Sequence, residues 1–72
     1  LNPHNAEYWK AAAHAEFKIG NTISSISAYE EASHLSPEDK EIWLNWSFIY
    51  YEQGEHAKAV EVLAQGMEER PD

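Results

Sequence analysis

Apolar and small residues recur along the chain at intervals of three, four and seven, in four blocks separated by short polar or glycine-containing breaks. Such intervals place side chains on one face of an α-helix. The aromatic run from Trp43 to Tyr51 has a strand-like composition, but it lies inside fourteen residues at helical spacing, which favours a helix. The pattern predicts no strand and four helices, near residues 6–18, 22–35, 40–53 and 56–69.

Capping residues mark where these helices begin and end. Asn5 can accept a hydrogen bond from the first turn of the first helix, and Gly20 supplies the backbone freedom needed at its end. Residues 36–39, with the sequence SPED, combine a cap, a proline suited to a first turn and an acidic residue three positions after the cap. Gly54 then ends the third helix.

Each predicted helix has one face that we expect to lie against the core. Gly66 stands inside the fourth helix, where glycine costs about 1 kcal/mol relative to alanine, so we expect a close approach by another helix. Val62, Ala64 or part of Met67 is expected to look outward to a neighbouring unit. The expected core-facing residues are Trp9, Ala12, Ala13 and Glu16 in the first helix; Ser25, Ile26, Tyr29, Ala32 and Ser33 in the second; Trp43, Trp46, Ser47 and Tyr50 in the third; and Ala59, Val60, Leu63, Gly66 and Met67 in the fourth.

Four landmarks repeat with a period of 34 residues, which is typical of stacked two-helix units. One such unit cannot bury its apolar face alone, so the core forms where units stack. We therefore expect a single domain over 1–72, with one repeat over 6–39, a second over 40–72, and residues 1–5 as the tail of a preceding repeat. The repeated pairs are Pro3 and Pro37, Trp9 and Trp43, Gly20 and Gly54, and Pro37 and Pro71.

In order and spacing these residues resemble the tetratricopeptide repeat (TPR) family. The resemblance covers nearly the whole chain and implies an all-α fold, a fragment of a right-handed α-solenoid made of two antiparallel helix pairs. Glu16, Ser25 and Trp46 depart from the family pattern, which has an aromatic residue, an alanine and a leucine there. The positions that carry the resemblance are Trp9, Ala13, Gly20, Tyr29, Ala32 and Pro37 in the first repeat, and Trp43, Trp46, Ser47, Tyr50, Gly54, Ala59, Leu63, Gly66 and Pro71 in the second.

The first repeat also resembles the related half-a-TPR family, whose members serve as scaffolds in RNA-processing assemblies. Trp9, Glu16 and the pair Gly20-Asn21 carry this second resemblance. That family usually has an arginine early in its second helix, where both repeats of this chain have an aliphatic residue. An RNA-processing scaffold is therefore one alternative function, and a purely structural spacer with no ligand is another.

The TPR resemblance implies a protein–protein interaction module in which the first helix of each pair lines a concave groove for a peptide or helix. We expect Phe17, Phe48 and Tyr51 to anchor the partner, because they lie beside the core stripes and aromatic residues recur as binding hot spots. The alternative is that these rings pack between units. The groove candidates are Glu7, Lys10, His14, Phe17 and Lys18 in the first repeat, and Glu41, Leu44, Asn45, Phe48, Tyr51 and Glu52 in the second.

One TPR subfamily clamps the C-terminal carboxylate of chaperone peptides with lysine, arginine and asparagine side chains. Lys10 and Asn45 match two of the positions of that clamp. His14 stands where the subfamily has an asparagine. A carboxylate clamp is therefore a more specific alternative for the same groove.

The charge balance narrows the classes of partner. Thirteen acidic and five basic residues give a net charge of −8, which opposes direct binding of nucleic acid or an anionic membrane. No apolar run approaches the ~18 residues of a membrane span. The expected partner is therefore a protein or peptide ligand of mixed or basic charge. We also expect a cytoplasmic location, although a targeting segment of a longer parent would lie outside these residues.

The chain begins at Leu1 rather than Met, so we expect it to be a piece of a longer array. Solenoids of this kind normally need three or more units and polar capping helices. We therefore expect the isolated two-repeat unit to be marginally stable or to self-associate.

Sequence motifs for catalysis or cofactor binding are missing from this chain. It has no cysteine, and its three glycines form no phosphate-binding loop. Among the four histidines, His34 has a carboxylate one helical turn earlier, Glu30, and a surface helix accounts for that pair equally well. We expect no enzymatic activity, no cofactor and no metal site.

Overall fold

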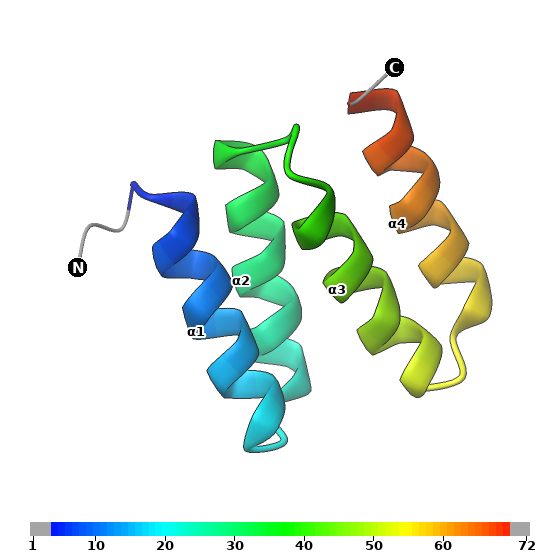
Figure 1. The fold of residues 1–72 in the computed structure, drawn as a ribbon. Helices are drawn as coiled ribbons and strands as arrows, with labels where there is room; N and C mark the ends of the chain where they lie inside the picture. Colours follow the sequence, from blue (N-terminus) through cyan, green and yellow to red (C-terminus); the bar gives the residue numbers. More distant parts are fainter. Residues whose placement is uncertain (1–3, 70–72) are drawn as a thin grey trace.

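The computed structural model describes residues 4–69, which form four helices and no strand (Figure 1). The predicted helices are confirmed, and the third ends one residue earlier than expected. Pro3 and Pro71, together with most of the expected tail over 1–5, lie outside the described residues. The helices are α1 (Ala6–Lys18), α2 (Thr22–Leu35), α3 (Lys40–Glu52) and α4 (His56–Glu69).

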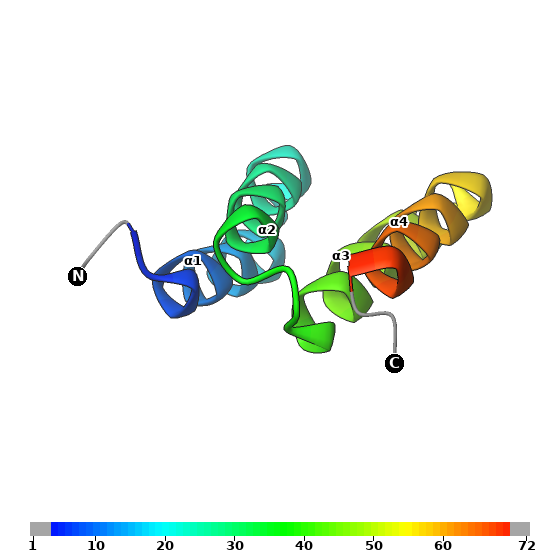
Figure 2. The same cartoon turned by 90° about the horizontal axis from the view of Figure 1, so that it is seen from above.

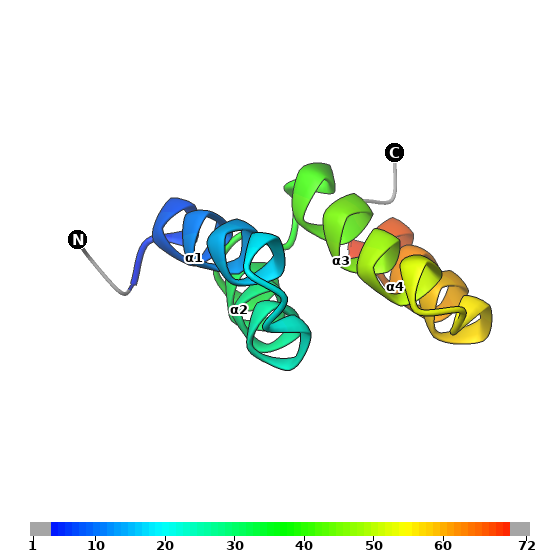
Figure 3. The same cartoon turned by 90° about the horizontal axis from the view of Figure 1, so that it is seen from below.

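The helices form two antiparallel pairs, α1 with α2 and α3 with α4, and the pairs meet where α2 packs against α3 (Figure 1). Views from above and below place α1 and α3 on one side and α2 and α4 on the other (Figures 2 and 3). The Cα trace spans 31 × 28 × 13 Å, as expected for two helix pairs side by side. The predicted all-α fragment of two helix pairs is thus confirmed.

Local hydrogen bonds explain the helix boundaries. The side chains of Asn5 and Asp39 accept hydrogen bonds from the backbone N–H groups of Glu7 and Glu41, at 2.8 and 3.0 Å, and so cap α1 and α3. Gly20 and Gly54 follow α1 and α3 with φ of 90° and 80°. A side chain would strain this left-handed backbone, which is why glycine ends both helices.

The core lies mainly on α3, which is buried on two sides. Trp43, Trp46 and Ser47 are buried as expected, and Tyr50 is half-buried. The predicted stripe missed Ile42 and Ile49, which are 0% and 1% exposed. A single stripe describes a helix with one neighbour, whereas α3 packs against both α2 and α4 and therefore needs a second apolar face.

The predicted inward face of α4 was partly wrong. Val60 and Met67 are 64% and 72% exposed, and Leu63 is 38% exposed. Val62, which we expected to look outward, is 6% exposed and belongs to the core. The helix packs mainly against α3, so its contact stripe is narrow: only Ala59, Val62 and Gly66 are buried.

Gly66 allows α4 to lie directly against the Trp43 side chain. A Cβ atom added to Gly66 would stand 2.6 Å from Cγ of Trp43 and 2.9 Å from its Cβ, closer than real atoms approach. The indole N–H of Trp43 donates a 2.9 Å hydrogen bond to the carbonyl of Pro37, and its ring stacks on Trp46 with centroids 5.6 Å apart. The expected close approach at Gly66 is confirmed, and the approaching Trp43 side chain is held by its hydrogen bond and by stacking on Trp46.

Three serines are buried in this core, and each has a hydrogen-bond partner for its hydroxyl group. Ser25 is fully buried in α2 and donates a 2.7 Å bond to the Ala13 carbonyl of α1. Ser33 and Ser47 donate to carbonyls three residues earlier in their own helices. Because a buried hydroxyl is costly only when unpaired, serine is tolerated where the TPR pattern has alanine.

We predict that Gly66→Ala destabilises the chain, although alanine is the better helix former. The added methyl group would overpack Trp43 at a typical cost of about 1–3 kcal/mol, which exceeds the gain of about 1 kcal/mol in helix propensity. Urea unfolding followed by circular dichroism measures the difference. Gln65→Ala, at the exposed neighbouring position, is the control and should change little. A Gly66→Ala chain more stable than wild type would contradict the close approach.

Candidate protein-binding faces

Helices α1 and α3 lie on the same side of the molecule (Figures 2 and 3). We call the exposed groove candidates of these two helices, except Leu44 and Tyr51, the groove face. Leu44 and Tyr51 are exposed on α3 and line a hollow between α3 and α4, and Phe48 lies at its border with the groove face because it lines that hollow as well. The groove face consists of Glu7, His14, Lys18, Glu41, Asn45, Phe48 and Glu52.

Phe17 and Phe48 contact each other across the junction of the two repeats. Their ring centroids are 6.4 Å apart and the planes meet at 72°, an edge-to-face arrangement. Phe17 is half-buried and packs against the core, whereas Phe48 remains 49% exposed. Phe17 therefore holds the junction together, and Phe48 is the large apolar ring that the groove face offers to a partner.

Lys10 joins the beginnings of α1 and α3. Its Nζ lies 2.7 Å from Glu41, 2.8 Å from Asp39 and 3.4 Å from Glu7, and its side chain is only 15% exposed. The hydrogen bonds to Asp39 and then Glu41 raise the pKa of Lys10 above its usual value. Burial alone would raise the pKa of Asp39, but the hydrogen bonds from Lys10 and from the N–H of Glu41 lower it. The ion cluster, one lysine with three carboxylates, thus bridges the two repeats and keeps an excess of negative charge.

Asn45 also has a partner within the chain. Its side chain hydrogen-bonds the hydroxyl of Tyr29, a core residue of α2. Burial, followed by the nearby Glu41 carboxylate, raises the pKa of Tyr29, and the bond to Asn45 partly offsets this. Because Lys10 and Asn45 both serve the junction between repeats, the two positions that match a carboxylate clamp are already engaged.

A second apolar surface, on the side of α3 and α4 that faces away from α2, escaped the sequence reasoning. We call it the end face. It opens into two hollows, of about 400 and 160 Å³, between α3 and α4. Val60, Leu63 and Met67 stand 34 residues after Ile26, Tyr29 and Ser33, and this correspondence had placed them on the expected core face. The end face consists of Leu44, Tyr51, Val60, Leu63 and Met67, which are 53%, 59%, 64%, 38% and 72% exposed.

Between His4 and Glu69 no three histidine, cysteine or carboxylate side chains gather closely enough to hold a metal ion. No helix in this part of the chain is long and apolar enough to cross a membrane.

Comparison with known proteins settles which repeat this is. A family model described as "Tetratricopeptide repeat" matches residues 20–72. The chain belongs to the tetratricopeptide repeat family. It is 32% identical over 62 residues to human tetratricopeptide repeat protein 33, an alignment that covers 82% of this chain and 24% of that protein. The mouse protein of the same name is 30% identical over 63 residues, with 83% of this chain and 24% of that protein covered.

The chain thus spans about a quarter of the length of the relatives it matches. TPR repeats generally mediate protein–protein interaction or scaffolding, and proteins of this family are typically not enzymes. The two-repeat unit described here is therefore a TPR unit with two exposed faces that contain apolar side chains, the groove face and the end face.

We predict that Lys10→Met destabilises the chain by about 1–2 kcal/mol at pH 7, between the values for exposed and buried ion pairs. Folding lowers the pKa of Asp39. The stability that Asp39 contributes is therefore fully present above its unfolded pKa of about 3.9, and it is lost as the pH falls through the lower pKa of Asp39 in the folded chain. The stability difference between wild type and Lys10→Met should therefore shrink in acid, as measured by urea unfolding from pH 7 to pH 2.5.

Lys58→Met provides a matched control, because Lys58 pairs with Glu55 at 3.0 Å but is 57% exposed. Because ion pairs in contact with water contribute little to stability, this substitution should destabilise the chain far less than Lys10→Met. If the two substitutions lower the free energy of unfolding equally, or if the effect of Lys10→Met does not change with pH, the ion cluster does not stabilise the contact between the repeats.

Proposed function

We propose that this TPR unit binds a segment of a partner protein along the groove face, with an apolar side chain of the partner against Phe48. Phe48 carries the proposal: it lies in the middle of α3 and is half exposed, and Phe17 holds its ring edge-on. A ring that is both exposed and fixed in place loses little conformational freedom on binding. Aromatic residues of this kind recur as binding hot spots.

The charges around Phe48 favour a basic partner segment. Glu7, Glu41 and Glu52 line the groove face, against Lys18 and the titratable His14. The one further lysine of α1, Lys10, points its charge into the ion cluster and is not available to a ligand. With a net charge of −8 on the whole chain, the field at this face attracts cations. We expect the partner segment to place lysine or arginine beside its apolar anchor.

The carboxylate clamp does not fit this geometry well. A peptide terminus would have to displace Asp39 and Glu41 from Lys10 and also separate Asn45 from Tyr29. Each exchange would leave a part-buried group of the junction without its partner, which costs free energy. The groove face therefore favours an apolar and basic segment over a C-terminal carboxylate.

A peptide-display selection on the chain tests this proposal, followed by fluorescence anisotropy with the enriched peptides. We predict that those peptides combine an apolar residue with basic neighbours and that Phe48→Ala weakens their binding at least tenfold, about 1.4 kcal/mol. Glu52→Lys should weaken binding as well, because it reverses a charge on the groove face.

Two control substitutions lie elsewhere on the surface. Ile23→Ala shortens an exposed apolar side chain of α2, and Glu30→Lys reverses an exposed charge on the same helix. Both should leave peptide affinity within about twofold. Binding that depends on Ile23 rather than Phe48 would reject the groove face. A selection that enriches no peptide would support the structural-spacer alternative.

A further inference from the structure

The ion cluster and the contact between Phe17 and Phe48 follow one another along the junction of the two repeats. Lys10 meets Glu41 at 2.7 Å. Seven residues later on each helix, Phe17 meets Phe48 with ring centroids 6.4 Å apart. Because α1 and α3 begin at the same end of the molecule (Figure 1) and a helix rises about 1.5 Å per residue, the cluster lies about 10 Å from Phe48 along the groove face. A segment bound against Phe48 therefore reaches the cluster within about three extended residues.

The cluster leaves negative charge accessible on the groove face. Its one ammonium group and three carboxylates give a net charge of −2. The side chains of Glu7 and Glu41, which belong to both the cluster and the groove face, are 76% and 63% exposed, whereas that of Lys10 is 15% exposed. A partner can therefore approach two of the carboxylates, while the lysine that compensates them is largely covered.

The two exposed carboxylates have capacity for a second cation. The Nζ of Lys10 lies 3.4 Å from Oε2 of Glu7 and 2.7 Å from Oε1 of Glu41. An ionised carboxylate can accept several hydrogen bonds. A lysine or arginine of a bound segment can thus share Glu7 and Glu41 with Lys10, but the two positive charges then repel each other.

The position of Lys10 gives it a role opposite to the one that the carboxylate-clamp resemblance implies. In such a clamp a lysine attracts an anionic group of the ligand. Here Asp39, at 2.8 Å, and Glu41 hold the ammonium group within the junction. Lys10 therefore acts on the groove face as a fixed positive charge that reduces the attraction for cations.

From this geometry we infer that Lys10 sets the charge specificity of the groove face, because it competes with a basic residue of the partner for Glu7 and Glu41. The inference rests on the proposed function and adds a residue that lowers the affinity for the basic ligand instead of raising it. Removal of the lysine charge leaves three carboxylates without compensation and strengthens the binding of a basic segment.

Two short labelled peptides serve as probes, and fluorescence anisotropy measures their binding at ~0.1 M salt, where the Debye length is about 10 Å. Each peptide contains one leucine as the apolar anchor. The lysine peptide has a lysine three residues before and three residues after the leucine, a separation of about 10 Å in an extended chain, which reaches the cluster in either direction of binding. The glutamine peptide has glutamine at both positions and is otherwise identical.

Two substitutions break the same ion pair and change the charge in opposite directions. Lys10→Met should tighten binding of the lysine peptide at least threefold. Asp39→Asn should weaken it at least threefold, because a negative charge is lost, and asparagine still caps α3. Both variants should bind the glutamine peptide within about twofold of wild type. Loss of the contact between Lys10 and Asp39 alone would shift both variants in the same direction.

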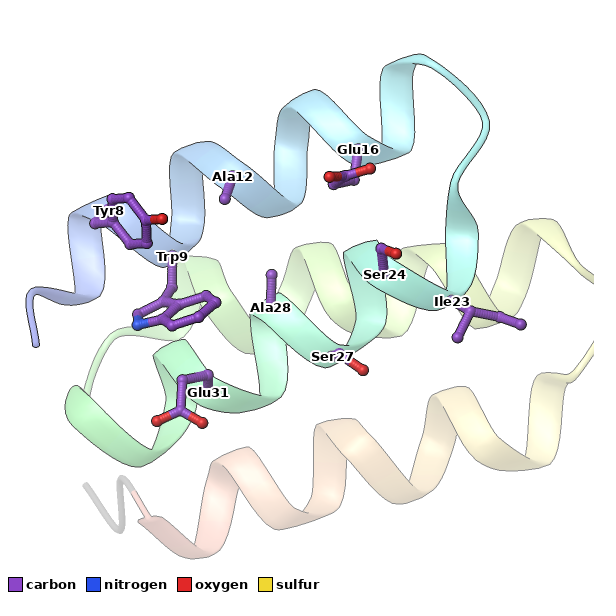
Figure 4. A pocket seen from close by; sticks show the side chains of 9 residues that line it. All are labelled: Tyr8, Trp9, Ala12, Glu16, Ile23, Ser24, Ser27, Ala28 and Glu31. Atoms are coloured by element: carbon purple, nitrogen blue, oxygen red, sulfur yellow. The ribbon is translucent and has the colours of Figure 1, made fainter. Parts of the chain in front are cut away.

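Two charge-matched controls lie on the helices of the other side of the molecule. Lys58→Met removes an exposed positive charge from α4. Glu31→Gln removes an exposed negative charge from α2, where Glu31 lines a hollow of about 480 Å³ between α1 and α2 (Figure 4). Because salt screens exposed charges, both controls should leave the affinity for the lysine peptide within about twofold.

Several results would overturn the role of Lys10. These are weaker or unchanged binding of the lysine peptide to Lys10→Met, a shift of Asp39→Asn in the same direction as Lys10→Met, and equal effects of Lys10→Met on the two peptides.

Phe48→Ala separates this inference from the proposed function. If Phe48→Ala weakens both peptides while Lys10→Met does not distinguish them, only the role of Lys10 is rejected. If Phe48→Ala changes neither affinity, the groove-face site itself is rejected. Failure of both peptides to bind wild type at about 1 mM rejects both ideas.

Circular dichroism checks that the variants fold. Should Lys10→Met unfold, Lys10→Gln repeats the test, because its neutral amide can still donate a hydrogen bond to Asp39 or Glu41. It should also tighten binding of the lysine peptide and leave the glutamine peptide unchanged. Unchanged or weaker binding of the lysine peptide to Lys10→Gln would overturn the inference as well.

Discussion

The Trp43 side chain is the point at which three parts of the chain are fixed to one another. Its ring lies against the bare backbone of Gly66 in α4, its N–H donates to the carbonyl of Pro37 in the turn after α2, and its face stacks on Trp46. Because α4 packs mainly against α3, this contact helps to fix the orientation of the last helix, together with the buried side chains of Ala59 and Val62. The contact between Trp43 and Gly66 therefore also affects the shape of the exposed side of α3 and α4.

The helices were predictable because their signals are local. Caps such as Asn5 and Asp39, the two positive-φ glycines and the spacing of tryptophans set the boundaries without reference to the rest of the fold. Burial was less predictable, since it depends on how many neighbours a helix has. Ile42 became core because α3 has neighbours on two sides, and Val60 became surface because α4 lacks a second one.

The candidate site was predictable to a smaller extent. The TPR resemblance placed the groove residues on α1 and α3, but their partners belong to this chain alone. Nothing in the local sequence of Lys10 shows that Asp39, 29 residues later, neutralises its charge. Likewise the aromatic character of Phe17 does not show that it packs against the core while Phe48 remains half exposed. Contacts between repeats decided which candidates remain free to bind.

The paired indoles give this chain a built-in optical distinction between its repeats. Trp43 and Trp46 both belong to the second repeat and stack with ring planes 20° apart, whereas Trp9 lies in the first repeat with Tyr8 edge-on to it. Stacked rings share their electronic transitions, so the near-ultraviolet spectrum of the second repeat differs in kind from that of the first. In a solenoid, where each unit is stabilised mainly by its neighbour, such spectra can report whether the two repeats melt together or one after the other.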